Sequence, residues 1–412
     1  MVASCRWPVR RTRVLFKREQ REPRDDEGIV TAFRDGQVTL RSKRREEGFT
    51  NAIQEFGYQG VRRGDLVIHS MDGFAGAIGV SDSDGKSSPV VHCYRPNLGV
   101  DARYYAYLLR DLALRGFVTS LAKGIRERST AFDSETFRSL VVPYPALAEQ
   151  RAIADYLDTE TARIDALITK KQRMITLVKA RSMLVAEGLA TGDLELVSGE
   201  DGARPQTLSG LQGAPDSNWS RFPLKSLFDF SKGRDAQRLS REYVSEHPGE
   251  FPVFSGQTGG DGIFGSIDTY DFSCASGAIL VATVGAEAMK CRLISGRFSL
   301  SQNCALMTPR ANVQVSLPFV MAHLRRLFVM KRAEIPDHMQ PSLRIEDLNR
   351  FWIRLPPIDT QIEIGLFIEE LDRASGKIAQ VMSAQLDLLV ERRQALITAA
   401  VTGELEIPGV AA

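Results

Sequence analysis

The chain has 412 residues, 43% of them hydrophobic and 25% charged, and its formal net charge is +2 at pH 7. These values are typical of a soluble globular protein that is long enough for two domains with connectors. A membrane-spanning protein is disfavoured because no apolar run reaches the roughly 18 residues that a spanning helix needs. The small net charge neither indicates nor excludes a nucleic-acid-binding protein, because binding depends on where the cations lie.

Cysteine usage and the N-terminal residues both predict a cytoplasmic protein. The five cysteines are scattered, without a Cys-x-x-Cys pair or a neighbouring histidine cluster, at Cys5, Cys93, Cys274, Cys291 and Cys304. This spacing disfavours a zinc site and a disulfide framework and favours reduced thiols. Residues 1–7 lack the apolar stretch of a secretory signal.

The first block, residues 1–144, is predicted to contain short strands joined by polar loops. Residues 64–68 are an apolar run behind a turn residue, which predicts a buried strand. Asp65, Asp84 and Lys86 have a spacing that a metal-dependent nuclease could use. The preferred interpretation of residues 83–86, Ser-Asp-Gly-Lys, is a hairpin turn. The corresponding positions of the second block carry no carboxylate, which favours the turn.

Two segments of the first block carry candidate DNA contacts. One is a basic cluster after a strand-like run, formed by Arg41, Lys43, Arg44 and Arg45. Because two glutamates follow it directly, this cluster is either a DNA contact or a solvated turn. The other is a polar loop expected between two helices, residues 123–130, whose candidate contacts are Arg126, Arg128 and Ser129. Arginine suits guanine and phosphate.

A long helix is predicted after the first block. Residues 148–190 lack proline and contain glycine only at Gly188, and such a helix would span roughly 65 Å. Apolar residues alternate at spacings of three and four, the pattern of a coiled-coil seam. The seam consists of Ile153, Leu157, Ile164, Leu167, Met174, Val178 and Val185, and is interrupted by Glu160, Lys171 and Arg181. Gly192 suits the left-handed conformation past a helix end.

The second block, residues 198–355, repeats the first more loosely. Trp7 corresponds to Trp219, and Cys93 to Cys304. Its candidate DNA contacts lie near turns and in residues 335–342, the counterpart of the loop at 123–130: Lys232, Arg234, Arg238, Gln257, Lys290, His338 and Gln340. Glutamine suits adenine.

The second helix repeats the first in one register. Gln150 and Gln361, and likewise Thr191 and Thr402, are 211 residues apart, with no gap between these positions. The second seam is Ile364, Ile368, Leu371, Ile378, Met382, Leu389 and Leu396, interrupted by Ser375, Gln385 and Arg392. A seam by itself indicates only that two helices pack. Two helices, two blocks and one register together predict a tandem duplication over nearly the whole chain.

The repeated segment resembles the helical regions of type I restriction-modification specificity subunits. The resemblance is carried by Leu-x-x-Gln-x-x-Ile-x-x-Tyr/Phe-Leu/Ile-Asp/Glu, by residues 392–397 and by residues 401–405. Residues 58–67, 76–80, 84–85 and 88–89 resemble the target-recognition domains of the same family. The likeness spans essentially the whole chain, although the first helix departs from the second at residues 180–183.

The resemblance implies a mixed α/β (α+β) fold with two target-recognition domains, residues 1–144 and 198–355. Two helical spacers, residues 145–197 and 356–412, would form an antiparallel coiled coil that holds them apart. Each domain would read one half of a bipartite target in double-stranded DNA. Two methyltransferase subunits would dock on the scaffold, and restriction/translocase subunits would complete the complex.

Catalytic motifs are missing from the sequence. Pro356-Pro357 lacks the polar and aromatic neighbours of a methyltransferase motif, and no G-x-x-x-x-G-K occurs. We therefore expect no catalytic, cofactor-binding or metal-binding residues here, with S-adenosylmethionine, ATP and Mg on the partner subunits. The alternative is a DNA-recognition scaffold of another phage-defence methylation system. A self-sufficient nuclease is disfavoured.

Overall fold

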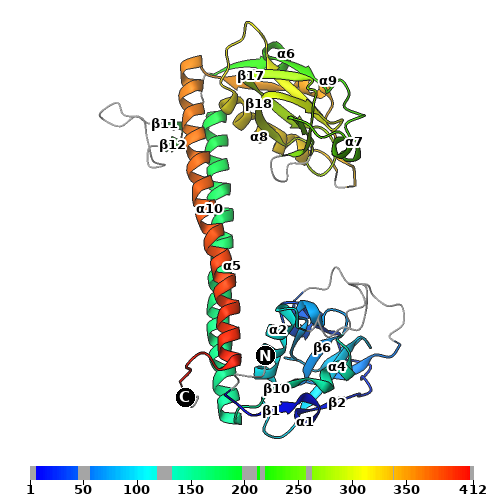
Figure 1. Ribbon diagram of the computed structural model, residues 1–412. Helices are drawn as coiled ribbons and strands as arrows, with labels where there is room; N and C mark the ends of the chain where they lie inside the picture. The colour runs from blue at the N-terminus through cyan, green and yellow to red at the C-terminus, as the bar shows by residue number, and fades with distance from the viewer. Residues whose placement is uncertain are drawn as a thin grey trace. The chain divides into compact units, whose positions relative to one another are not determined.

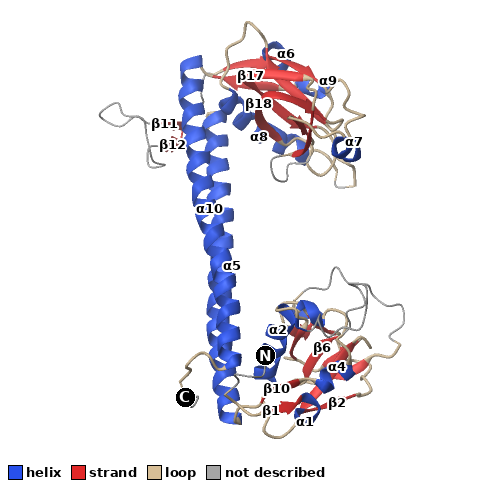
Figure 2. Ribbon diagram, viewed as in Figure 1, coloured by secondary structure: helices blue, strands red, loops and turns tan. Residues whose placement is uncertain are grey.

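The computed structural model describes residues 6–44, 56–117, 132–196, 211–213, 219–256, 262–336 and 338–408. The chain divides into two compact units, one of residues 1–172 with 383–412 and one of residues 173–382. Each unit contains one α/β domain and a part of both long helices, α5 (Leu147–Thr191) and α10 (Ile358–Thr402) (Figures 1 and 2). None of the described helices combines the length and the apolar character needed to cross a membrane.

The domain of the first unit is built on an antiparallel sheet with the order β2-β9-β6-β7. These strands are β2 (Phe16–Glu19), β9 (Val91–Pro96), β6 (Leu66–His69) and β7 (Ile78–Val80). The other described strands of this domain pair as β1 (Val9–Arg11) with β10 (Val141–Pro143), β3 (Val30–Ala32) with β4 (Val38–Leu40), and β5 (Gln59–Val61) with β8 (Gly85–Ser87). Its helices are α1 (Thr12–Leu15), α2 (Ala102–Leu114), α4 (Ser134–Ser139) and the 3-10 turns η1 (Arg41–Lys43) and η2 (Gly73–Ala75).

Both faces of this sheet are covered, because the first three residues of β6, Leu66, Val67 and Ile68, are apolar and buried. Leu66 and Ile68 point toward α2 and the larger core, whereas Val67 points to a second cluster with Val30 and Val38. Successive side chains of a strand point to opposite faces, so an uninterrupted apolar run is buried on both. The buried strand predicted at residues 64–68 is confirmed.

The domain of the second unit is built on a sheet with the order β14-β19-β17-β18-β15-β16. The strands are β14 (Phe228–Ser231), β19 (Cys304–Pro309), β17 (Phe272–Ala282), β18 (Cys291–Leu300), β15 (Phe251–Phe254) and β16 (Ile263–Ile267). Among the described strand pairings of this sheet, β15 with β18 is parallel and the others are antiparallel. Further elements are β11 (Leu194–Leu196), β12 (Leu211–Gly213), β13 (Ser220–Pro223), α6 (Leu224–Leu227), α7 (Arg241–Glu246), α8 (Leu317–Ala333), α9 (Ile345–Arg350) and β20 (Trp352–Leu355).

Successive side chains of strand β17, like those of β6, are buried alternately on the two faces of the sheet. Ile279 and Val281 belong to the core that includes α8, whereas Ala278 and Leu280 belong to a cluster on the other face. The order of elements also repeats. Each block starts with a strand and a short helix (β1–α1 and β13–α6), and each ends with a short helix, a strand and a long helix (α4–β10–α5 and α9–β20–α10). The second long helix begins and ends 211 residues after the first. The predicted tandem duplication is thus confirmed.

The two long helices pair antiparallel within each unit. In the first unit, Arg393 binds Asp165 with Nε–Oδ1 and Nη2–Oδ2 distances of 2.9 and 3.2 Å. Further along α5, Lys171 Nζ donates to Gln385 Oε1 at 2.6 Å, so that two polar residues predicted to interrupt the seams meet each other. In the second unit, Ser182 Oγ donates to Asp372 Oδ1 at 3.0 Å. The predicted antiparallel coiled coil is confirmed.

The predicted seams are correct at their first positions and wrong at three later ones, whereas Val178, Val185, Leu371, Met382, Leu389 and Leu396 are half-buried. Ile153, Leu157 and Ile164 are buried, whereas Leu167, Met174 and Ile378 have 41%, 53% and 43% of their surface exposed. An α-helix with 3.6 residues per turn drifts by about 20° per heptad, so a strict heptad pattern rotates away from its partner. The ends of both helices instead contact the α/β domains.

Each domain receives the C-terminal end of a long helix into its core. Ile397, Ala400 and Val401 of α10 pack in the first unit, and Ala186 and Leu189 of α5 pack in the second. Both helices end at glycines with positive φ, 82° at residue 192 and 81° at residue 403, as the sequence predicted.

Candidate nucleic-acid interface

Two loops of the second unit lie against each other and bring predicted DNA contacts together. The β17–β18 loop, residues 283–290, meets the segment between α8 and α9, residues 334–344. Gly285 N donates to Pro341 O at 3.0 Å, and Leu343 N donates to Thr283 O at 2.8 Å. Lys290 lies on the first loop, and His338 and Gln340 lie exposed on the second. The position of residues 335–342 between two helices, as predicted, is confirmed at the described residues.

The conformation of the β17–β18 loop is held by its own backbone. Met289 is buried with a φ of 69°, a left-handed conformation that a side chain usually makes costly. Met289 N donates to Ala282 O at 2.8 Å, and Ala282 N donates to Lys290 O at 2.9 Å. Arg332 Nη1 donates to Ala288 O at 2.9 Å from the end of α8. No sequence motif marks Met289, because its role depends on contacts between distant segments.

Lys232, Arg234 and Arg238 lie on the segment between β14 and α7. The backbone N–H of Arg234 donates to Asp271 Oδ2 at 3.0 Å. The Arg238 guanidinium lies 4.6 Å from the Tyr243 ring centroid, and Tyr243 stacks on His247 at 4.2 Å. Arg238 therefore belongs to a stacked cation–aromatic group on the domain surface.

The predicted basic cluster of the first unit contacts its own domain. Arg44 Nη2 lies 2.7 Å from Asp35 Oδ2, Lys43 Nζ donates to Ser83 Oγ at 2.6 Å, and Arg41 Nε donates to Thr31 Oγ1 at 3.0 Å. Partial burial raises the pKa of Asp35, but hydrogen bonds from Arg44 and the Gln37 backbone outweigh it and leave that pKa lowered. DNA contact by the three cations stays a prediction. Arg45, Arg126, Arg128, Ser129 and Gln257 lie outside the described residues.

The residues considered for a nuclease have structural partners. Asp65 is 3% exposed, accepts a hydrogen bond from the Arg62 backbone at 2.9 Å and is bound by the Arg21 guanidinium. Asp84 Oδ1 accepts from the Arg63 backbone at 2.8 Å. The predicted hairpin turn at residues 83–86 is wrong, because β8 pairs with β5 and not with β7. A turn signal marks a change of direction but does not select the partner strand.

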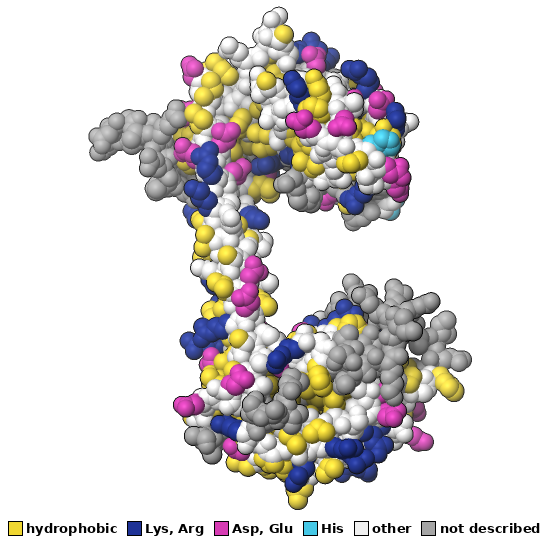
Figure 3. Space-filling model, in the orientation of Figure 1, with side chains coloured by type: hydrophobic (Ala, Val, Ile, Leu, Met, Phe, Trp, Pro, Cys, Tyr) yellow, Lys and Arg dark blue, Asp and Glu magenta, His cyan; other side chains and the backbone are white. Residues whose placement is uncertain are grey.

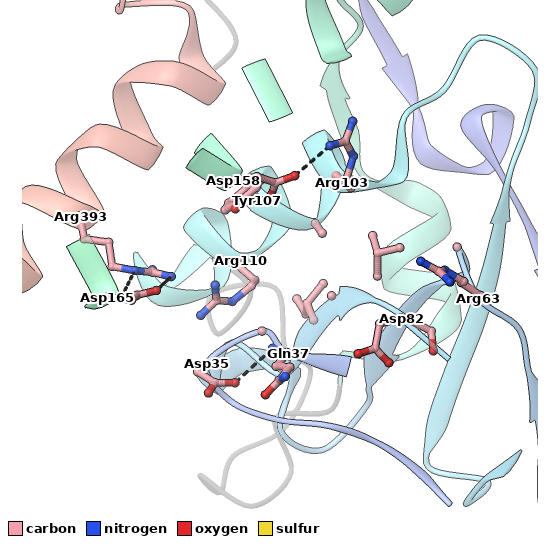
Figure 4. A pocket seen from close by; sticks show the side chains of 17 residues that line it. Asp35, Gln37, Arg63, Asp82, Arg103, Tyr107, Arg110, Asp158, Asp165 and Arg393 are labelled. Carbon is pink, nitrogen blue, oxygen red and sulfur yellow. Dashed lines mark hydrogen bonds and ion pairs between the residues drawn. The ribbon is translucent and has the colours of Figure 1, made fainter. Parts of the chain in front are cut away.

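A cavity of about 830 Å³ in the first unit lies between the domain and the long helices (Figure 4). Arg103 Nη1 lies 2.8 Å from Asp158 Oδ2, and Tyr107 Oη donates to Asp158 Oδ1 at 2.9 Å. Burial and the nearby Arg393 lower the pKa of Arg110, which donates to Gly76 O at 3.1 Å. Two arginine–aspartate pairs of the lining, Arg103–Asp158 and Arg393–Asp165, bind each other, an arrangement suited to holding the helices against the domain.

Cys93 and Cys304 occupy equivalent strands, β9 and β19, and both are fully buried. The predicted correspondence of the two positions is wrong by two residues, because Cys93 pairs with Glu19 of β2 whereas Leu306 pairs with the equivalent Ser231 of β14. Burial raises the pKa of the Cys93 thiol to about 12 and that of Cys304 to about 11. Both thiols are therefore protonated at neutral pH and are poor nucleophiles.

Comparison with known families identifies the second half of the chain. Residues 216–384 match the sequence profile of the type I restriction modification DNA specificity domain. This part of the chain is therefore similar to type I specificity domains. Because the first block is a copy of the same fold, the chain resembles a type I specificity subunit in both halves, and the family resemblance found in the sequence is confirmed.

Curated relatives point to the same family. The chain is 26% identical over 170 residues to the putative type I specificity subunit S.MpnORF285P of Mycoplasma pneumoniae (40% of this chain, 52% of the relative). It is 25% identical over 159 residues to S.MpnORF507P of the same organism (38% of this chain, 41% of the relative). The chain thus spans about half the length of the curated relatives it matches.

One solved structure shares the fold over nearly the whole chain. It is described as the structural basis of complex assembly and conformational transition of the type I R-M system, and a chain in it matches with a TM-score of 0.68 at 15% identity. The match covers 98% of this chain and 100% of that one. The two-domain, two-helix architecture of this chain is therefore a known fold.

Proposed function

We propose that this chain is the DNA-specificity subunit of a type I restriction-modification complex and reads a bipartite target in double-stranded DNA. The observation that carries the proposal is the duplication: a type I specificity domain and a second copy of its fold, each joined to a pair of antiparallel helices. Two separate readers suit two half-sites on one duplex, whose face repeats every ~34 Å. Residues 1–144 would read one half-site and residues 198–355 the other, with residues 145–197 and 356–412 as spacers. A cytoplasmic location of the chain is proposed, because its proposed ligand is DNA.

The decisive experiment exchanges one reader. Residues 1–144 are replaced by the corresponding block of a relative, and the methylated motif of the host is sequenced. One half of the motif should change while the other half and the gap stay the same. A chimera whose motif changes in both halves would contradict two independent readers.

The chain is proposed to contribute recognition but no catalysis. Its charged cavity in the first unit is lined by ion-paired side chains, and Cys93 and Cys304 are protonated at neutral pH. S-adenosylmethionine, ATP and Mg would act on the partner subunits. Methyl transfer, DNA cleavage or ATP hydrolysis by the purified chain alone would contradict this part of the proposal.

Two methyltransferase subunits are the proposed partners, and the long helices offer two equal surfaces for them. Leu177 and Leu388, equivalent positions of α5 and α10, are 57% and 63% exposed. Arg181 and Arg392 lie one helical turn further on and are also exposed. Two copies of one protein need two like surfaces. Restriction/translocase subunits would join the complex that these subunits form.

The docking surface is tested by co-purification and native mass measurement. Leu388→Ser should remove one of two methyltransferase copies, and Leu177→Ser with Leu388→Ser should remove both. Val390→Ser is the matched control, since Val390 is 56% exposed on the same helix and its equivalent is Lys179. Retention of two copies by the double variant would contradict docking at these leucines. Purification without any methyltransferase would favour another kind of scaffold.

A further inference from the structure

A group of exposed cations gathers around the edge strand β2 of the first domain. We define it as the basic band: Arg10, Arg11, Arg13, Lys17, Arg18, Arg95 and Arg138, all exposed. They belong to β1, α1, β2, β9 and α4. Figure 3 shows lysine and arginine side chains gathered over the part of this domain where Figure 1 labels α1, β2 and α4.

Strand pairing and helix packing bring these cations together. Lys17 on the edge strand β2 lies directly opposite Arg95 on β9. Helix α1 packs against α4, and Thr12 N donates to Leu140 O at 2.9 Å, which places Arg13 and Arg138 on neighbouring helices. Residues separated by as many as 128 positions of the chain thus gather around the edge strand β2. Lys17 and Arg95 lie on one face of the sheet and Arg18 lies on the other, because successive side chains of a strand alternate.

Few carboxylates neutralise the band. Glu19 lies 3.6 Å from Lys17 Nζ and 3.7 Å from Arg95 Nη1. Within the described parts of the chain, the remaining arginines of the band have no carboxylate within ion-pair distance. Like charges directly opposite each other on neighbouring strands destabilise a sheet. Lys17 opposite Arg95 therefore does not stabilise the isolated domain, but the pair is suited to binding a polyanionic ligand.

The band is absent from the second copy of the fold. The equivalents of Arg10, Arg11 and Arg18 are Phe222, Pro223 and Phe230, and those of Lys17, Arg95 and Arg138 are Asp229, Thr308 and Asn349. Only Arg13 keeps a cation, at Lys225. Asp229 is itself bound to Arg310 at 3.2 Å. The shared fold therefore does not require these cations.

One end of the band lies near the loop that follows β6, the counterpart of a candidate DNA loop of the second unit. Arg18 lies opposite Tyr94 of β9, and the centroid of the Tyr94 ring lies 6.5 Å from that of His92. Burial and then the charge of Arg18 lower the pKa of His92. His92 lies opposite Ile68, one residue before the end of β6. The loop that follows β6 is the counterpart of the β17–β18 loop that carries Lys290.

We propose that the basic band binds the phosphate backbone of double-stranded DNA beside the half-site read by the first domain. The two domains then contribute unequally: the first adds sequence-independent affinity that the second lacks. Arginines suit this role because each guanidinium donates to phosphate oxygens in a fixed fork. The inference rests on the proposed function, since it takes the ligand to be the same duplex.

The test measures how binding of the full chain to a duplex of arbitrary sequence depends on salt. The band variant is Arg11→Gln/Arg13→Gln/Arg18→Gln. The matched control removes three exposed cations from the corresponding elements of the second unit, Arg221→Gln/Lys225→Gln/Arg350→Gln. Each lost phosphate contact reduces the slope of log K against log salt by about 0.9, so the band variant should lose about 2 to 3 and the control none. The methylated motif should be the same for wild type and both variants.

The outcomes separate the band from the wider proposal. A wild-type slope in the band variant would overturn the band as a DNA contact. Equal losses in the band variant and the control would overturn the inequality of the two domains. If the band variant keeps the wild-type salt slope but no longer co-purifies with a partner subunit, the band binds an acidic protein surface instead of DNA. Absence of duplex binding by the wild-type chain would contradict DNA recognition itself. Circular dichroism melting of both variants checks that they are folded.

Discussion

Gln150 and Gln361 make the same two hydrogen bonds in the two halves of the chain. Gln150 Nε2 donates to Pro145 O at 2.9 Å, and Gln361 Nε2 donates to Pro356 O at 2.8 Å. The Oε1 of Gln150 accepts from Asp101 N at 2.8 Å, and the Oε1 of Gln361 accepts from Ser316 N at 3.3 Å. Both amides are buried. Each fastens the first turn of a long helix to the start of the domain helix, α2 or α8.

Replacing the second of these amides should destabilise the chain. In Gln361→Leu, the Pro356 carbonyl and the Ser316 N–H lose their buried partner, at about 1–3 kcal/mol for each group, so a loss of about 2–6 kcal/mol is expected. Urea unfolding of the full chain measures it. Gln380→Leu changes an exposed glutamine of the same helix and should stay within about 0.5 kcal/mol of wild type. Equal stability of both variants would show that the Gln361 bonds contribute nothing.

Acid should weaken the attachment of α5 to the second domain through His323. This ring is buried, and its Nδ1 donates to Ala190 O at 2.8 Å. Burial, opposed by that hydrogen bond, lowers the pKa of His323 below its usual 6.5. The stability linked to this lowered pKa is fully present above pH 6.5 and decreases as the pH falls below it, because the unfolded state takes up the proton first.

The variant that tests this linkage is His323→Gln. As the pH falls from about 7.5 to about 5.5, roughly one unit on each side of 6.5, the unfolding free energy of wild type should decrease relative to that of His323→Gln. The exposed His247→Gln serves as control. A pH-independent difference for His323→Gln would rule out the linkage.

One glycine of α10 should be replaceable with a gain. A Cβ at Gly376 meets no atom within 4 Å, and the position is exposed in the interior of the helix. Gly376→Ala should therefore stabilise the chain by about 1 kcal/mol through helix propensity. A Cβ at Gly365 in the same helix would lie 2.3 Å from Ser316 Oγ, so Gly365→Ala should show no gain. Thermal unfolding of the two variants checks the contrast.

Base reading by the second domain should depend on Gln340. If its exposed amide contacts adenine, Gln340→Ala should cost roughly 1–3 kcal/mol at one base position of the second half-site and nothing elsewhere. Methylation of a duplex library by the chain with its methyltransferase subunits measures each position. Lys290→Ala on the neighbouring loop should weaken all sequences alike, as expected for a phosphate contact. Uniform weakening by Gln340→Ala would assign it to the backbone instead.

Spacing between the half-sites should depend on the end of the first helix. Residues inserted beside Gly192, which has a φ of 82°, should lengthen the connection between the readers without touching either domain. The methylated motif should keep both halves and change only its gap. A motif with altered bases would mean that this junction takes part in reading.

Much of the architecture follows from local sequence. The absence of proline and the 211-residue register predicted two helices, and both begin and end within one residue of equivalent positions. Helix formation depends on hydrogen bonds between residues four apart, and glycine relieves the left-handed ends at residues 192 and 403. The apolar run at residues 64–68 likewise predicted a buried strand, because a side-chain period of two is a local property.

Only the tertiary structure decided which distant segments meet. Tyr104 Oη donates to Val401 O at 3.1 Å across 297 residues, and no local pattern pairs them. The run of cations between Arg10 and Arg18 is present in the printed sequence, but Arg95 and Arg138 join it only through the β2–β9 register and the packing of α1 on α4. Leu167 and Met174 fit the heptad pattern yet lie exposed. The period of a helix fixes which residues share a face, whereas contacts with the partner helix and the domains decide whether that face is buried.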